Sequence, residues 1–507
     1  MASFPESPNP SAPAVRTADA PDERRWLLWL LLFAIAVRIA TLGVYPLMDN
    51  TEARYAEIAR KMIETGDWIT PQFQYGVAFW SKPPLSTWLT AGTYAAFGVN
   101  EFAARLSSLV CCLLVLWITV DLAGRRAVAG LPLKTAVVLF TTPLFFISAG
   151  AVMTDPALTV GTTLSMAGFW QAMTREGRVA RVWGYLFFVG LAIGLLAKGP
   201  VGVVLTFMPA GLWTLWKGGI GNVWRRLPWI TGLVLTTALA LPWYLLAESR
   251  TPGFLDYFII GEHWKRYTVT GWTGDRFGTA HARPRGMIWP LSILATLPWC
   301  AVWLGMLWQA RRRGAPPVAT ADDGWRAYLL LWLFASPVFF TFAGNILFTY
   351  VLPALPAFAL LVAEAWTAVG DERGRGASTK ISALAIPVLM VLGLVFVVPR
   401  VGPERSQKAL VAQYQALRAA EQERLVYVNE APQSAEFYAG GKVVTVKTLP
   451  ELDRFLGDGQ RDFYALTQSQ FDERPDLLTR LTPVGRFGRY LLLQDAGPLP
   501  LPARPAG

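Results

Sequence analysis

Eleven residues near the amino terminus gather the groups that acid–base and phosphate chemistry require. The run Tyr45–Tyr55 holds two carboxylates, Asp49 and Glu52, and the cation Arg54, directly after the first long apolar segment. Lys82 follows further along in the sequence Ser-Lys-Pro-Pro. A carboxylate can act as a general base, and ammonium and guanidinium groups bind phosphate. The run therefore predicts chemistry on a lipid phosphate at a membrane surface.

Asp49 and Glu52 also have a structural interpretation. The pattern Asp-x-x-Glu before a helix is typical of a capping box, in which Asp49 accepts a backbone N–H and Glu52 reaches back to the cap. In the functional interpretation one of these carboxylates deprotonates or orients an acceptor hydroxyl. Both interpretations stay open, because a cap also holds a carboxylate rigidly.

More ionisable residues lie at the turns between later apolar segments. Asp155 precedes a proline, so it is either a helix N-cap or a functional carboxylate at the edge of an apolar bundle, where charge is costly. Lys198 lies between two apolar segments with almost no loop. Lys82 and Lys198 either extend to lipid headgroups or bind a donor phosphate. Guanidinium groups bind phosphate in a bidentate manner, so further candidates are Arg54, Arg105 and Arg266.

The sequence contains no motif that requires a cofactor, and it neither requires nor excludes a divalent metal ion. His263 and His281 are the only histidines. His263 is a metal candidate, but a site there would need further ligands from elsewhere in the chain. The three cysteines form no CxxC pattern, and we expect them to be small core residues.

The composition is that of a membrane protein. Of the 507 residues 53% are hydrophobic and only 16% are charged, whereas a soluble domain has about 25% charged residues. The mean hydropathy of +0.36 agrees with this assignment. The net charge of +11 does not indicate nucleic acid as a partner, because Lys and Arg lie in short loops between apolar runs.

The apolar pattern predicts an α-helical polytopic membrane protein with about 11–13 spans. When the apolar segments are numbered as membrane spans, every basic loop falls on the same side of the membrane, which the positive-inside rule assigns to the cytoplasm. The loops 46–104 and 247–286, Asp155, Lys198 and the tail then face the periplasm. The apolar segments lie near residues 26–45, 105–122, 133–150, 157–173, 182–197, 199–217, 228–246, 287–309, 325–342, 346–367 and 381–399.

Three regions follow from this pattern. Residues 1–25, rich in Pro, Ala and Ser, are expected to form a disordered cytoplasmic tail. Residues 26–400 form the membrane domain, with two interfacial helices predicted at 52–64 and 85–98. Residues 401–507 predict a small periplasmic α/β domain, because strand and helix patterns alternate there. Its strands are expected near 425–428, 442–446, 463–466 and 490–493, and its helices near 407–423, 450–456 and 475–481.

The order of several short motifs resembles the C-type membrane glycosyltransferases, which use polyprenyl- or dolichyl-phosphate sugars. Within them the chain is most similar to the family of protein O-mannosyltransferases and the bacterial aminoarabinose transferase of lipid A. Each motif alone is weak, but their order and spacing over residues 26–367 are specific. The motifs are Thr51–Arg60, Gly66–Trp68, Lys82–Pro84, Phe97–Arg105, Thr154–Pro156, Lys198–Pro200 and Tyr350–Pro356.

The resemblance implies an outward-facing active site under two interfacial helices, with a catalytic or acceptor-positioning carboxylate in the first loop. Many relatives have Asp-Glu where this chain has Thr51-Glu52, so we assign the catalytic role to Asp49, then Glu52, with Asp155 as a further candidate. Ser81 stands where the lipid A enzyme has Glu, which counts against a metal at that position. The donor-phosphate ligands that we expect are Lys82, Lys198, Arg54, Arg266 and Tyr350.

We therefore predict a glycosyltransferase of the bacterial inner membrane that moves a sugar from undecaprenyl phosphate to lipid A, a glycan or a protein at the periplasmic face. Its expected partners are this donor, a lipid or glycan acceptor and membrane lipids. The alternative is a flippase for lipid-linked sugars. Transporters place polar groups near the bilayer midplane and often contain repeats, whereas here the charges cluster at one face.

Overall fold

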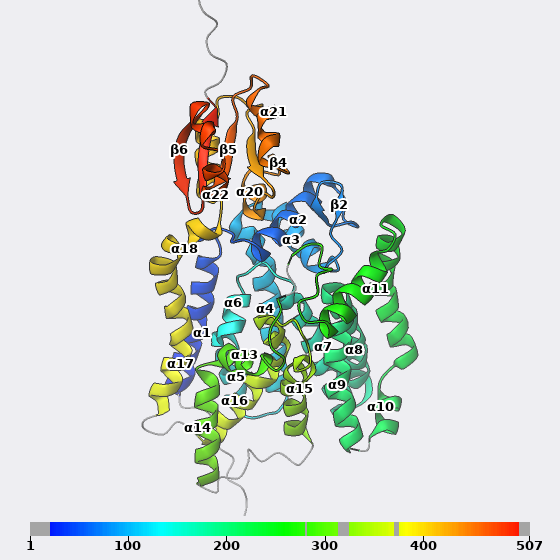
Figure 1. Ribbon diagram of the computed structural model, residues 1–507. Coiled ribbons are helices and arrows are strands. Elements are labelled where there is room, and N and C mark those ends of the chain that lie inside the picture. Colours follow the sequence, from blue (N-terminus) through cyan, green and yellow to red (C-terminus); the bar gives the residue numbers. More distant parts are fainter. Residues whose placement is uncertain (1–20, 218, 279–280, 313–323, 370–374, 496–507) are drawn as a thin grey trace, which may run out of the picture.

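The computed structural model describes residues 21–217, 219–278, 281–312, 324–369 and 375–495. A helical bundle forms the larger part, and a domain with a β-sheet stands at one end of it (Figure 1). Helix α1 (Pro21–Thr41) includes the last residues of the expected amino-terminal tail. Residues 1–20 of that tail lie outside the described residues.

Every apolar segment that the sequence predicts coincides with helical structure, which confirms a helical polytopic membrane protein. The described chain contains five helices long and apolar enough to cross a membrane, or six if one bent pair counts as a span. The main helices of the bundle are α1, α4 (Glu101–Gly124), α7 (Asp155–Thr174), α8 (Gly177–Lys198), α9 (Pro200–Lys217), α11 (Trp229–Arg250), α15 (Trp325–Phe340), α16 (Leu355–Val369) and α17 (Arg375–Leu392).

Two predicted spans are broken helices, and proline lies at both breaks. Helices α13 (Ile288–Thr296) and α14 (Trp299–Arg312) meet at 85° around Pro298. Helix α5 (Leu131–Thr141) ends just before α6 (Pro143–Ser148), which begins with proline. Proline lacks an N–H and disfavours the helical conformation of the residue before it, so the helix stops there.

Helices α7 and α8 pack closely because glycines face each other. A Cβ atom added to Gly161 would lie 2.6 Å from the backbone nitrogen of Gly194 and 2.7 Å from the carbonyl oxygen of Gly190. Only glycine permits this approach of two backbones, as in many membrane helix pairs. The pairing is antiparallel, so it brings Asp155 at the start of α7 next to Lys198 at the end of α8.

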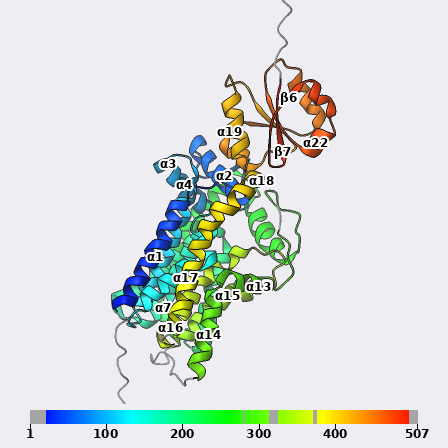
Figure 2. The ribbon, with the colours of Figure 1, turned by 90° about the vertical axis from the view of Figure 1, so that its left-hand side faces the viewer.

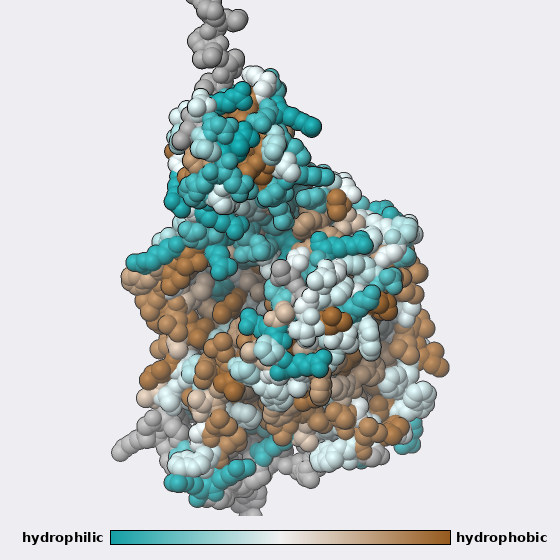
Figure 3. All heavy atoms as spheres, viewed as in Figure 1, coloured by the Kyte–Doolittle hydropathy of each residue, from teal (hydrophilic) through white to brown (hydrophobic). Residues whose placement is uncertain are grey.

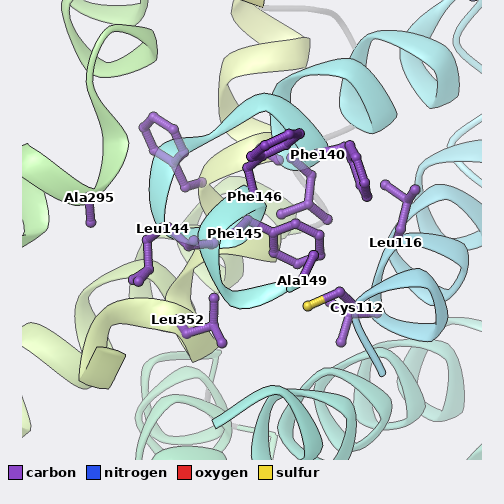
Figure 4. Close-up of a cluster of buried hydrophobic side chains, with 14 of the residues drawn as sticks. Cys112, Leu116, Phe140, Leu144, Phe145, Phe146, Ala149, Ala295 and Leu352 are labelled. Carbon is purple, nitrogen blue, oxygen red and sulfur yellow. The ribbon is translucent and has the colours of Figure 1, made fainter. Parts of the chain in front are cut away.

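The bundle core beside these helices is aromatic. Phe140, Phe145 and Phe146 from α5 and α6 pack with Cys112 of α4 and Leu352 of η2 (Phe348–Ala354) (Figure 4). The rings of Phe140 and Phe146 lie 5.9 Å apart in an edge-on arrangement. Cys111 and Cys112 are buried, as we expected, whereas Cys300 is only half-buried.

The first loop forms two helices, α2 (Thr51–Thr65) and α3 (Leu85–Phe97), as predicted. A short hairpin of β1 (Gln72–Gln74) and β2 (Val77–Ala78) joins them. Both helices lie between the bundle and the sheet domain (Figure 1). Helix α2 is buried on all sides from Ala56 to Met62, and this stretch includes the charged residues Glu57, Arg60 and Lys61.

The tail domain has a five-stranded sheet in the order β4-β3-β5-β7-β6, so the predicted α/β domain is confirmed. Residues 475–481 begin as a 3₁₀ helix, η5 (Pro475–Thr479), but then enter strand β6, which the sequence analysis missed. Helix α20 (Gln433–Tyr438) packs on α2, and helix α19 (Lys408–Leu417) packs on α20. The strands are β3 (Leu425–Val428), β4 (Val443–Val446), β5 (Phe463–Thr467), β6 (Leu481–Phe487) and β7 (Tyr490–Asp495).

Helix α18 (Val398–Arg405) leads from the bundle into the tail domain, and α17 runs beside α1 (Figure 2). Apolar side chains cover much of the bundle surface, whereas the tail domain is mainly hydrophilic (Figure 3). The basic helix α10 (Ile220–Arg226) and the basic end of α14 lie at the end of the bundle opposite the tail domain (Figure 1). These two basic segments and the tail domain therefore lie at opposite ends of the bundle, as predicted.

Candidate active site

A cavity of about 670 Å³ lies among the first loop, the start of α7, the turn between α8 and α9, and the segments η1 (Asp256–Lys265) and η2. Much of its wall is apolar. Its described lining also contains the four cations Arg54, Lys82, Lys198 and Arg266 and the three carboxylates Asp155, Glu262 and Asp275.

Asp155 and Lys198 form one buried ion pair in this wall. The Nζ atom of Lys198 donates to Oδ1 of Asp155 at 2.6 Å and lies 4.5 Å from the centre of the Tyr350 ring. Asp155 is the first residue of α7, after the N-cap residue Thr154. Asp155 is therefore not the N-cap residue of α7. Lys198 contacts a carboxylate and does not extend to lipid headgroups.

A second charged group joins the first loop to η1. Lys82 Nζ donates to Glu262 Oε2 at 3.0 Å, and Arg266 Nη1 donates to the same oxygen at 3.1 Å. Arg266 also contacts Asp275 Oδ2 at 2.9 Å. Burial disfavours the charged form of Glu262, but Lys82 and Arg266 outweigh burial and hold the pKa of this carboxyl below its ordinary value. The group therefore remains ionic.

Arg54 reaches the cavity from α2. Its guanidinium donates to the Phe277 carbonyl oxygen, and among the described residues it makes no ion pair with a carboxylate. A Cβ atom added to Gly278 would lie 2.8 Å from Nη1 of Arg54, so the turn at 277–278 fits closely around this side chain. Arg54 thus adds a positive charge that its immediate neighbours do not neutralise.

His263 lies in the same wall, but its two ring nitrogens face carbonyl oxygens. Nδ1 is 2.8 Å from the oxygen of Phe258, and Nε2 is 3.1 Å from the oxygen of Lys198. Burial lowers the pKa of this imidazole. Among the described residues no group of three His, Cys, Asp or Glu side chains is placed to hold a metal. The geometry therefore does not support His263 as a metal ligand; it links η1 to the end of α8.

Known proteins resemble this chain in sequence. A family model described as dolichyl-phosphate-mannose-protein mannosyltransferase matches residues 42–258. The undecaprenyl phosphate-alpha-4-amino-4-deoxy-L-arabinose arabinosyl transferase of Pseudomonas savastanoi pv. phaseolicola is 31% identical over 374 residues, covering 72% of this chain and 66% of the relative. The chain belongs to the C-type membrane glycosyltransferases.

Two further comparisons place this C-type glycosyltransferase among its relatives. The arabinosyl transferase 1 of Pseudomonas fluorescens is 29% identical over 73% of the chain, and the match spans only 63% of the relative. The crystal structure of ArnT from Cupriavidus metallidurans bound to undecaprenyl phosphate has a TM-score of 0.76 with 22% identity, covering 94% of this chain and 99% of that one. At this identity the likeness shows a shared fold.

In this glycosyltransferase Asp49 lies outside the cavity lining, contrary to our expectation. Its Oδ1 accepts from the backbone nitrogen of Ser434 at 2.8 Å, and its Oδ2 accepts from the Ser434 hydroxyl at 2.6 Å. The residue before α2 is Asn50, so the predicted Asp49 cap is also wrong. Asp49 instead connects the first loop to α20 of the tail domain.

Glu52 likewise points away from the cavity. Both of its oxygens accept from the buried Arg105 guanidinium at 2.8 Å, so Arg105 is also committed to this pair. Glu52 also accepts from the backbone nitrogen of Val152 at 3.3 Å. The helical period explains the difference, because positions three or four apart share a face and the adjacent position does not. Thr51, Arg54 and Tyr55 line the cavity, whereas position 52 faces the bundle.

The cavity contains chemistry-bearing residues that our sequence analysis did not select. Glu262 and Asp275 hold the cations of the wall, and Tyr55 and Thr51 line it. The spacing of Glu262 four residues before Arg266 was a detectable signal, because such pairs meet on a helix. The partnership of Asp275 with Arg266 had no such signal, since it depends on how an irregular loop folds back.

Proposed function

We propose that this chain transfers a sugar from an undecaprenyl-phosphate donor to lipid A, a glycan or a protein acceptor at the periplasmic face of the bacterial inner membrane. The observation that carries the proposal is a partly apolar cavity in which four cations and Tyr350 share a wall with Asp155. The cations suit a phosphate, and the apolar lining suits a polyprenyl chain. The relatives that are undecaprenyl phosphate-alpha-4-amino-4-deoxy-L-arabinose arabinosyl transferases support the same class of donor.

The charged groups divide into two roles. Lys82, Lys198 and Arg266 are proposed to bind the donor phosphate and to stabilise the negative charge that grows on it as the sugar leaves. Asp155 is proposed to accept the proton of the acceptor hydroxyl. The acceptor oxygen then bonds to the anomeric carbon, the bond from that carbon to the phosphate oxygen breaks, and undecaprenyl phosphate leaves as a monoester.

Periplasmic orientation is part of the proposal. The basic ends of α10 and α14 lie opposite the tail domain, and the positive-inside rule assigns basic loops to the cytoplasm. With this orientation the donor reacts where no nucleotide is available, and a polyprenyl monophosphate needs none as a leaving group.

The test uses the purified full-length protein in detergent, an undecaprenyl-phosphate sugar and lipid A as the first acceptor. Release of undecaprenyl phosphate, measured by mass spectrometry together with the glycosylated acceptor, is the expected result. A flippase would move the donor across a proteoliposome membrane without breaking its sugar–phosphate bond. Transport without release would therefore overturn the proposal in favour of that alternative.

A further inference from the structure

We infer that the sugar carried by the donor of this site is uncharged, and is not an amino sugar with an ammonium group. The inference rests on the proposed function, because it concerns the sugar of the same lipid-phosphate donor. It comes from the charge balance of the cavity. The described lining holds four cations and three carboxylates, so the charges 4 − 3 leave one positive charge in excess.

Each of the three carboxylates already has a cationic partner. Asp155 binds Lys198 at 2.6 Å, and Glu262 binds both Lys82 at 3.0 Å and Arg266 at 3.1 Å. Asp275 also binds Arg266, at 2.9 Å. An ammonium group on the sugar would find no unpaired carboxylate in the described lining. It would instead stand near several fixed cations, and like charges repel strongly where water is scarce.

The donor phosphate itself accounts for the excess charge. A phosphodiester carries one negative charge, which balances the one positive charge that the wall has in excess. Arg54 is the cation that supplies the excess, because it binds a carbonyl oxygen rather than a carboxylate. Once the phosphate is bound the site is neutral, and no negative charge remains to attract a second cation.

Neutral polar groups complete the lining. The hydroxyls of Thr51, Ser81 and Thr349 are in the wall, and Oγ1 of Thr349 is buried without a hydrogen-bond partner among the described residues. Hydroxyls donate and accept hydrogen bonds, which suits the hydroxyls of a neutral sugar. The described lining therefore offers a sugar neutral hydrogen-bonding groups rather than an unpaired negative charge.

The experiment compares three undecaprenyl-phosphate donors that share one lipid and one ring. The first carries L-arabinose, the second 4-amino-4-deoxy-L-arabinose, and the third the N-formyl form of the second, which has its nitrogen but no charge. Each donor competes with radiolabelled undecaprenyl phosphate for the purified full-length protein at pH 7. We expect the L-arabinose and N-formyl donors to displace the label at concentrations about tenfold or more below that of the amino donor.

The N-formyl donor separates charge from size, because it is larger than the amino donor and neutral. The double variant Thr51→Asp, Ser81→Glu should reduce the preference for neutral donors, with thermal unfolding in the same detergent showing that the variant is folded. An amino donor that binds as well as or better than the neutral donors would overturn the inference and leave the proposed function intact. If the labelled undecaprenyl phosphate itself does not bind, the proposed function fails, and the inference fails with it.

Discussion

Asp155→Asn removes the negative charge opposite Lys198 and keeps the size of the side chain. In the wild-type protein the Lys198 ammonium is 2.6 Å from the carboxylate, and both residues are buried. The variant leaves this ammonium without its partner, which typically costs about 3–5 kcal/mol of stability. Its contact with the Tyr350 ring is present in both proteins, so it does not change this difference. We therefore expect a clear decrease in thermal stability.

The same change removes the proposed general base. General bases contribute a factor on the order of 10²–10⁴ to turnover. We expect turnover, corrected for the folded fraction, to decrease by a factor in that range.

Asp49→Asn is the matched control, because it is the same substitution in the other carboxylate. Burial raises the pKa of Asp49, while hydrogen bonds from Ser434 oppose this shift. The Asn oxygen can still accept from the Ser434 backbone, and the Ser434 hydroxyl can rotate to accept from the Asn amide. The loss of stability is then the difference between a charged and a neutral hydrogen bond, about 1 kcal/mol. Turnover should remain near that of the wild type.

Both variants are assayed by release of undecaprenyl phosphate at saturating donor and by thermal unfolding in the same detergent. If Asp49→Asn abolishes turnover at unchanged stability while Asp155→Asn stays active, the assignment of the base to the cavity wall is refuted. The first-loop carboxylate would then reach the acceptor after a rearrangement of the tail domain.

Four further outcomes are expected. Lys82→Ala should weaken binding of undecaprenyl phosphate by about 1.5–3 kcal/mol, roughly ten- to hundredfold, in a displacement assay. Glu52→Gln breaks the pair with buried Arg105, so the melting temperature should fall by the equivalent of about 3–5 kcal/mol, with turnover per folded molecule retained. Burial raises the pKa of Glu436 to about 7, so the folded protein binds the proton of this carboxyl more tightly than the unfolded chain does. The stability of the protein should therefore fall as pH rises from about 5 to 7. Glu436→Gln should remove that decrease in thermal scans. Alkaline phosphatase fused after residue 507 should be active, and an inactive fusion would contradict the periplasmic tail.

The secondary structure could largely be predicted from local sequence. All the apolar segments are helical, and helices α2 and α3 lie where the interfacial pattern placed them. The exceptions depend on partners elsewhere in the chain. The sequence pattern assigned no strand to residues 482–487, but these residues pair with β7 in a hairpin, and this pairing decides their conformation.

The amino-acid sequence by itself determined a helical membrane protein, a small α/β tail and residue types that suit phosphate binding, because hydropathy and motif order are local properties of the chain. Only the tertiary structure decided which carboxylates line the cavity. Asp49 is removed from the cavity by Ser434, 385 residues away, and Glu52 by Arg105. Asp155 and Lys198, 43 residues apart, meet because glycines let α7 and α8 pack closely. Such pairings depend on helix phase and packing, which no short stretch of sequence contains.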